Sequence, residues 1–447
     1  MAALLGTAAC GSAQPPETAQ PHEDARRGDG SPMPAPEPEY LSNDAPKDGA
    51  DQKTSAAEGG APATLWRETG VEDPSGHALE AFHAALARAA RGEGKARVLF
   101  YGASHVAGDT VTARVREHLT ARFGDGGPGL VMPAHPWKYY RPKAVGLESS
   151  GRRWKAGFVS AKDPVLDFYG PAGVFVETRR EGAYGAFVLG EKRRRPHHLR
   201  VHYLAQPGGG DVRVIIGDAA PVTLRTRAKS KHEAHADFDV PEGTARVELR
   251  TASSGPVRLF AARLEAGAPG VVVSALGVNG ARAKNQLHWE DAPLREFLRE
   301  EDPALVVLAY GTNESGDDDV PIASYEAEVR RVVSRVREAA PAASCLLIGP
   351  TDRPLRAEDG TWTDRPRTAD IVASQRRVAG DLGCGFFDLV AFMGGPLSMP
   401  SWVLADPPLA ANDHVHLTSR GYALLGDVLT RALLAGYRGA DGAVAPN

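Results

Sequence analysis

This sequence has few cysteines, no long apolar run and only a small net charge. Each of these features excludes a class of protein. Only three of the 447 residues are cysteine, too few for a disulfide-rich scaffold. No apolar run approaches the roughly 18 residues that span a bilayer. The net charge of −4 argues against a nucleic-acid-binding surface. With 42% hydrophobic residues, the length predicts two folded units plus a tail.

The three cysteines have different surroundings. Cys345 opens the apolar run CLLI, so we expect it to be buried as a small hydrophobe, and Cys384 precedes another such run. Cys10 follows the stretch MAALLGTAA, which resembles the end of a bacterial lipoprotein signal. This resemblance predicts an exported chain with a lipid on Cys10, and the alternative is an incidental thiol.

Composition and periodicity divide the chain into segments. Residues 1–10 resemble a partial lipoprotein signal, and residues 11–63 are rich in Pro, Ala and Glu, which predicts a disordered tether. Residues 147–265 lack helical periodicity and contain short alternating runs, which predicts an inserted all-β sandwich. Residues 64–146 and 266–447 alternate strand and helix patterns, which predicts one doubly wound, mostly parallel α/β sheet. Strands are expected at 98–101, 271–276, 305–310, 346–349 and 386–389, and helices at 77–91, 108–123, 293–299, 322–339, 371–382 and after 418.

The stretch VLFYGASHVAGD (98–109) places a serine where such a sheet carries its chemistry. An apolar strand ends at Gly102, Ser104 follows at once, and helical spacing begins at Gly108. Backbone N–H groups converge at a helix start that follows a strand end. We interpret Asp109 as a candidate N-cap of that helix and His105 as a packing or surface histidine.

Three further blocks are expected at the same rim of the sheet. They are GVNG (277–280), GTN (311–313) and DHVH (413–416). A serine hydroxyl needs an imidazole to take its proton, and the imidazole needs a carboxylate to hold its tautomer. Ser104, His416 and Asp413 supply these three groups. The Ser104 and Gly280 N–H groups and the Asn313 amide supply donors for an oxyanion.

In this order, the blocks around Ser104, Gly280, Asn313 and His416 resemble the SGNH (GDSL-like) hydrolases. More closely, SHVAGD (104–109), RFGDGG (122–127) and MGGP (393–396) resemble bacterial peptidoglycan O-acetylesterases, in which a β-sandwich similar to a carbohydrate-binding module interrupts the catalytic domain. The resemblance implies a flavodoxin-like fold. It implies an esterase that removes O-acetyl groups from an envelope glycan through an acetyl-enzyme, and an exported, periplasmic or cell-envelope location.

The chain departs from that family at Ala103, where the family usually has Asp. Two other functions therefore stay open. The same triad can transfer acetyl groups to another sugar, as an O-acetyltransferase does, and a lapsed site would leave a glycan-binding lipoprotein.

Other partners and cofactors are not expected. No His, Cys, Asp and Glu cluster suggests a metal, and residues 124–129 lack the lysine of a phosphate loop, so we expect no cofactor. We expect a monomer that binds no nucleic acid and contacts a membrane only through a lipid on Cys10. The basic run 192–195 is predicted to be a solvated loop between strands.

Overall fold

The computed structural model describes residues 65–161 and 167–438, so the expectations for Cys10 and for the tether lie outside the described residues. Its central sheet is parallel, in the order β13-β1-β14-β15-β18. These strands are short apolar runs, buried on both faces as the centre of a doubly wound sheet requires. Their bounds are β1 Lys95–Gly102, β13 Gly270–Gly277, β14 Leu305–Ala309, β15 Ser344–Ile348 and β18 Gly385–Phe387.

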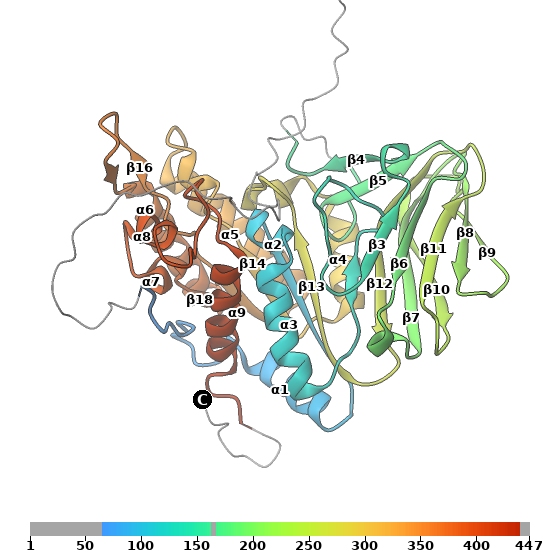
Figure 1. Cartoon of the computed structure of the whole chain (residues 1–447), viewed down its shortest axis with the longest axis horizontal. Helices are drawn as coiled ribbons and strands as arrows, with labels where there is room; N and C mark the ends of the chain where they lie inside the picture. Colours follow the sequence, from blue (N-terminus) through green and yellow to red (C-terminus); the bar gives the residue numbers. More distant parts are fainter. Residues whose placement is uncertain (1–64, 162–166, 439–447) are drawn as a thin grey trace, which may run out of the picture. The chain divides into compact units, whose positions relative to one another are not determined.

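Helices cover both faces of this sheet, because alternate side chains of each strand point to opposite sides. Val98 and Phe100 of β1 pack in one apolar cluster with α1, α3 and α9, and α3 and α9 lie side by side (Figure 1). Leu99 and Tyr101 belong to a second cluster with α4, α5 and α6. The helices are α1 Glu80–Ala90, α3 Thr110–Phe123, α4 Asp291–Glu301, α5 Ile322–Ala339, α6 Pro366–Asp381 and α9 Ser419–Leu434.

Two antiparallel sheets interrupt the α/β domain between β1 and β13. One has the order β10-β7-β12-β5-β4 with β2 beside β12, and the other has the order β3-β6-β11-β8-β9 (Figure 1). The predicted fold class, a parallel α/β sheet with an inserted β domain, is therefore confirmed. The strands are β2 Gly129–Val131, β3 Gly146–Ser149, β4 Lys155–Phe158, β5 Val174–Thr178, β6 Tyr184–Val188, β7 His197–Ala205, β8 Asp211–Ile216, β9 Val222–Arg225, β10 His232–Val240, β11 Arg246–Thr251 and β12 Val257–Ala266.

Short elements complete the described chain. Helix α2 follows β1, and a two-stranded hairpin of β16 and β17 lies between β15 and α6. Their bounds, with those of the remaining short helices, are α2 Ser104–Ala107, β16 Leu355–Arg356, β17 Trp362–Thr363, α7 Leu389–Met393, α8 Ser398–Val403, and the 3-10 segments Gly151–Arg153, Glu191–Arg193, Ala283–His288 and Glu314–Gly316.

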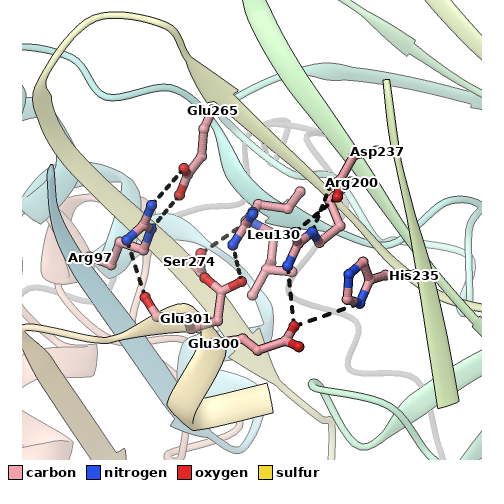
Figure 2. Close-up of polar contacts among 10 residues, drawn as sticks. Arg97, Leu130, Arg200, His235, Asp237, Glu265, Ser274, Glu300 and Glu301 are labelled. Carbon is pink, nitrogen blue, oxygen red and sulfur yellow. Dashed lines mark hydrogen bonds and ion pairs between the residues drawn. The ribbon is translucent and has the colours of Figure 1, made fainter. Parts of the chain in front are cut away.

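A network of ion pairs fastens the sandwich to the α/β domain. Arg97 of β1 pairs with Glu265 of β12 at 2.6 Å, and Glu265 is almost fully buried. Arg200 of β7 bridges Asp237 of β10, at 2.7 Å, and Glu300 of α4, at 3.2 Å (Figure 2). Breaking a buried pair by removing one partner costs about 3–5 kcal/mol. These ion pairs therefore connect β12, β7 and β10 of the inserted sheets to β1 and α4 of the α/β domain.

The cysteine expectation is wrong in one respect. Cys345 is buried, as expected, but it forms a disulfide with Cys384 rather than remaining a free thiol. The cause lies in the strand order, because Leu346 of β15 pairs with Gly385 of β18 and so brings the two preceding cysteines together.

The basic run 192–195 is also less solvated than predicted. Arg193 and Arg195 both pair with Asp125, at 3.6 and 3.0 Å, and only Lys192 and Arg194 are exposed. Within the described ranges, no helix combines the length and the apolar character needed to cross a bilayer.

Candidate active site

The candidate site lies at the carboxyl edge of the central sheet. The three adjacent strands β13, β1 and β14 end together, since Gly102 pairs with both Gly277 and Ala309. Ligand sites of open α/β sheets form outside such strand ends. The loops that leave these three ends carry Ser104, Gly280 and Asn313.

A tight turn presents Ser104 at the first residue of α2. The Ala103 carbonyl accepts hydrogen bonds from the N–H groups of Val106, at 3.1 Å, and Ala107, at 2.9 Å. A Cβ at Gly102 would lie 2.5 Å from Val106, and a Cβ at Gly277 would lie 2.2 Å from the Ala107 nitrogen. Glycine is therefore required at both strand ends for α2 to sit this close to the sheet.

The loop before α9 brings an imidazole and a carboxylate to the same place. Asp413 Oδ1 accepts the N–H groups of Val415 and His416, each at 2.9 Å, which fixes the carboxylate within its own turn. Asp413 Oδ2 lies 2.6 Å from His416 Nδ1. His416 Nε2 in turn lies 2.8 Å from the Ser104 hydroxyl oxygen. Three side chains from two distant stretches thus form one continuous hydrogen-bonded chain.

The surroundings of Asp413 keep it ionised. Partial burial alone would raise its pKa, but the hydrogen bonds from the His416 ring and backbone outweigh it and lower the pKa to about 2. An ionised Asp413 accepts a hydrogen bond from the N–H at His416 Nδ1. The lone pair of His416 Nε2 then faces Ser104.

The three expected oxyanion donors differ in whether they already form a hydrogen bond. Asn313 Nδ2 donates one hydrogen to the Ala281 carbonyl at 2.9 Å, which orients the amide and leaves its second hydrogen. Gly280 has a φ of +70°, and no atom lies within 4 Å of a Cβ built there. The N–H groups of Ser104 and Gly280 donate to no acceptor among residues 65–161 and 167–438. All three groups can therefore bind a negatively charged oxygen.

Glu314, next to Asn313, ties two of these loops together. Its buried carboxyl accepts the Gly311 N–H at 3.0 Å and the Ala283 N–H at 2.8 Å. Burial raises the pKa of Glu314. Its place directly after the GTN block is the sequence signal for this role.

Asp109 is the N-cap residue of α3, as expected, but its side chain accepts no N–H group of the first turn. The carboxylate instead accepts the Thr112 hydroxyl at 2.6 Å, the Arg116 guanidinium at 2.9 Å and the Lys143 N–H at 2.7 Å. Asp109 and Arg116 are both buried, and the bond from the Lys143 N–H ties the start of α3 to the segment just before β3.

His105 is a partly buried packing residue, as expected, and it lies against the site. Its Nδ1 is 2.8 Å from the Tyr422 hydroxyl, and its ring centre is 5.4 Å from that of His416. Burial, with the nearby His416, lowers the pKa of His105 to about 3, so it stays neutral at neutral pH.

One neighbour of the site was not foreseen from the sequence. Trp362 of β17 stacks on His414 with ring centres 4.2 Å apart, and His414 has a positive φ of 56°. Within the described ranges, no group of three His, Cys, Asp or Glu side chains is arranged to hold a metal ion.

Comparison with known proteins supports the predicted resemblance to the GDSL-like hydrolases. Residues 243–424 match the model of the GDSL-like Lipase/Acylhydrolase family. No curated protein matches the sequence. A solved structure of a peptidoglycan O-acetylesterase shares 24% identity and a TM-score of 0.70 over 82% of this chain and 99% of that one.

A second solved structure, a family two carbohydrate esterase from Cellvibrio japonicus, shares 12% identity over 65% of this chain and 97% of that one. Its TM-score of 0.26 is too low to carry an argument. The family match and the shared fold bear out the predicted resemblance to the SGNH hydrolases: residues 243–424 are similar to the GDSL-like lipase/acylhydrolase family, and the described chain shares the fold of the first structure.

Proposed function

We propose that this protein is a serine carbohydrate esterase that removes O-acetyl groups from peptidoglycan or another cell-envelope polysaccharide. The observation that carries the proposal is the 2.8 Å contact between Ser104 Oγ and His416 Nε2, with Asp413 behind the imidazole. Peptidoglycan is favoured because a solved structure that shares this fold is that of a peptidoglycan O-acetylesterase.

In the first half-reaction, Ser104 Oγ attacks the acetyl carbonyl carbon while His416 Nε2 takes the hydroxyl proton. The carbonyl oxygen becomes an oxyanion, which the Ser104 and Gly280 N–H groups and the Asn313 amide bind. The C–O bond to the sugar then breaks, and His416 returns the proton to the leaving sugar oxygen. Asp413 stabilises the imidazolium that forms in between.

In the second half-reaction, water replaces the sugar. His416 removes a proton from the water as its oxygen attacks the acetyl carbon, and the same three donors hold the oxyanion. Collapse of this intermediate breaks the bond to Ser104 Oγ, which takes the proton back from His416. The products are acetate and the free enzyme.

The Cys345–Cys384 disulfide supports a location outside the cytoplasm. Disulfides persist in oxidising compartments and are rare where thiols are kept reduced. We therefore propose an exported, periplasmic or cell-envelope protein, and the lipoprotein-like stretch before Cys10 supports an anchor through a lipid on that residue.

Acetate release from O-acetylated peptidoglycan tests the proposal. We expect release by the wild-type protein and a loss of at least a thousandfold in Ser104→Ala. Equal release by both proteins would exclude the serine mechanism. Adding a de-acetylated glycan acceptor distinguishes transfer from hydrolysis, because a transferase would move the acetyl group to the acceptor instead of releasing acetate.

A further inference from the structure

A groove of about 460 Å³ lies on the sandwich, away from the residues of the candidate active site. Its floor is formed by uncharged residues such as Trp154 and Val257, and Trp154 is held there by a 2.9 Å hydrogen bond from its indole N–H to the Tyr184 carbonyl. Its sides are basic, and the cations that line it are Arg152, Arg153, Lys155, Arg179 and Arg180.

The strand order explains why these cations converge. Strand β4 is the edge strand beside β5. Lys155, at the start of β4, lies opposite Glu177, near the end of β5, in the backbone register of the two strands. Arg152 and Arg153 precede β4, and residues 179 and 180 follow β5. Two segments more than 20 residues apart in sequence thus place their positive charges at one end of the same strand pair.

These charges are not neutralised within the described part of the chain. The one acidic residue that lines the groove, Glu177, already pairs with Arg258 at 2.9 Å. In residues 65–161 and 167–438, the side chains of Arg152, Lys155, Arg179 and Arg180 form no ion pair, whereas about half of the other arginines there do. A cluster of free cations in a chain of net charge −4 is therefore a feature of this groove.

Strand β4 also connects the groove to the candidate active site. Two residues beyond its other end, the Ser160 hydroxyl donates a 3.3 Å hydrogen bond to the carbonyl of Asn279, the residue before Gly280. Lys155 and Ser160 are five residues apart, so at most about 18 Å of extended chain separates them. A glycan a few sugars long can reach from one to the other.

We propose that this basic groove binds acidic groups, carboxylates or phosphates, on the polysaccharide whose acetyl esters reach Ser104. The ligand class follows from charge complementarity, because several unpaired guanidinium groups around a floor with an indole bind anions on a sugar chain. The proposal rests on the proposed function for its substrate, but the binding itself does not require catalysis.

Binding is measured with three dextrans that share one backbone: carboxymethyl-dextran, dextran phosphate and plain dextran. The protein carries Ser104→Ala, so the result does not depend on whether the esterase reaction occurs. We expect binding of at least one acidic dextran and none of plain dextran, with affinity falling as salt rises. The better of the two acidic polymers identifies the carboxylate or the phosphate as the preferred group.

Matched variants then locate the site. The groove variant carries Arg152→Gln, Lys155→Gln, Arg179→Gln and Arg180→Gln, and we expect it to bind at least tenfold more weakly. The control carries Arg213→Gln, Arg225→Gln, Lys229→Gln and Lys231→Gln, which removes the same charge from exposed positions in and around β8 and β9, and we expect less than a twofold change.

Three results would overturn the proposal. They are no binding of either acidic dextran, an equal loss in the two variants, and tighter binding to phosphatidylglycerol vesicles than to the dextrans. If the fourfold groove variant melts early, the single variant Lys155→Glu at an exposed position provides the test, with at least a threefold loss expected.

Discussion

Asp413→Asn is the substitution that tests the hydrogen-bonded chain most specifically. The wild-type carboxylate accepts two backbone N–H groups through Oδ1 and the His416 ring through Oδ2. An asparagine that keeps the two backbone bonds must turn its NH₂ group toward His416 Nδ1. His416 Nδ1 then has to accept the hydrogen bond, so the ring proton moves to Nε2. There it faces Ser104, and His416 can no longer take the proton of the serine hydroxyl.

The expected loss in kcat is about 10³- to 10⁴-fold, which corresponds to about 4–5 kcal/mol in the barrier. The assay is steady-state hydrolysis of p-nitrophenyl acetate at several pH values, together with a thermal melt. We expect KM to change little, since the substitution removes stabilisation of the imidazolium and no contact with the acyl group.

Asp388→Asn is the matched control. Asp388 also caps a turn, accepting the Ala391 N–H at 2.8 Å, and it also pairs with a cation, Arg376, at 2.7 Å, but no histidine lies behind it. We expect this variant to keep its wild-type kcat. If Asp413→Asn retained more than a tenth of the wild-type kcat, the role of Asp413 as the residue that orients His416 would be refuted.

Three other expectations concern the oxyanion donor, a buried acid and the disulfide. Asn313→Ala should lower kcat by about 10²- to 10³-fold with little change in KM, and an unchanged kcat for an acetyl ester would contradict its role as a donor. Burial raises the pKa of Glu233 to about 7 from an ordinary value of 4.5. The cost of ionising it, about 3 kcal/mol, is therefore fully present above pH 7 and mostly absent at pH 5. Glu233→Gln should raise the free energy of unfolding at pH 8 much more than at pH 5, as urea titrations would measure, and an equal effect at both values would contradict the raised pKa. Replacing Cys345 and Cys384 by serine opens a loop with a sequence separation of 39. The free energy of unfolding should fall by up to about 4 kcal/mol, whereas no change in denaturant midpoint would show that the disulfide adds no stability.

Local signals explain which parts of the fold and site could be predicted from the sequence. Each strand of the central sheet is an apolar run ended by glycine or a polar residue, and α5 was expected at residues 322–339, where it lies. The parallel order of the strands places all their carboxyl ends at one edge, so a motif after each strand had to lie near the others. An Asp three residues before a His can close its own turn, as Asp413 does.

The features that were missed depend on contacts between distant segments. The disulfide needs β15 beside β18, an order that periodicity alone does not reveal. The ion pairs of Arg193 and Arg195 could not be predicted, because their partner Asp125 lies about 70 residues earlier in the sequence.

Contacts between distant segments also explain what the sequence did not predict at Asp109, beside the candidate active site, and at the basic groove. Asp109 has the residue type and position of an N-cap, but the approach of Arg116 and Lys143 offered it stronger partners. The basic groove is invisible in the sequence because its cations are divided between segments that only the sandwich brings together.

Reaction with a serine-specific phosphonate, followed by peptide mapping in a mass spectrometer, tests the central claim most directly. The claim predicts one label, on Ser104, that forms at least a hundredfold more slowly in His416→Ala, where the same hydroxyl has lost its base. An unlabelled Ser104, or a labelling rate that does not change when His416 is removed, would contradict it.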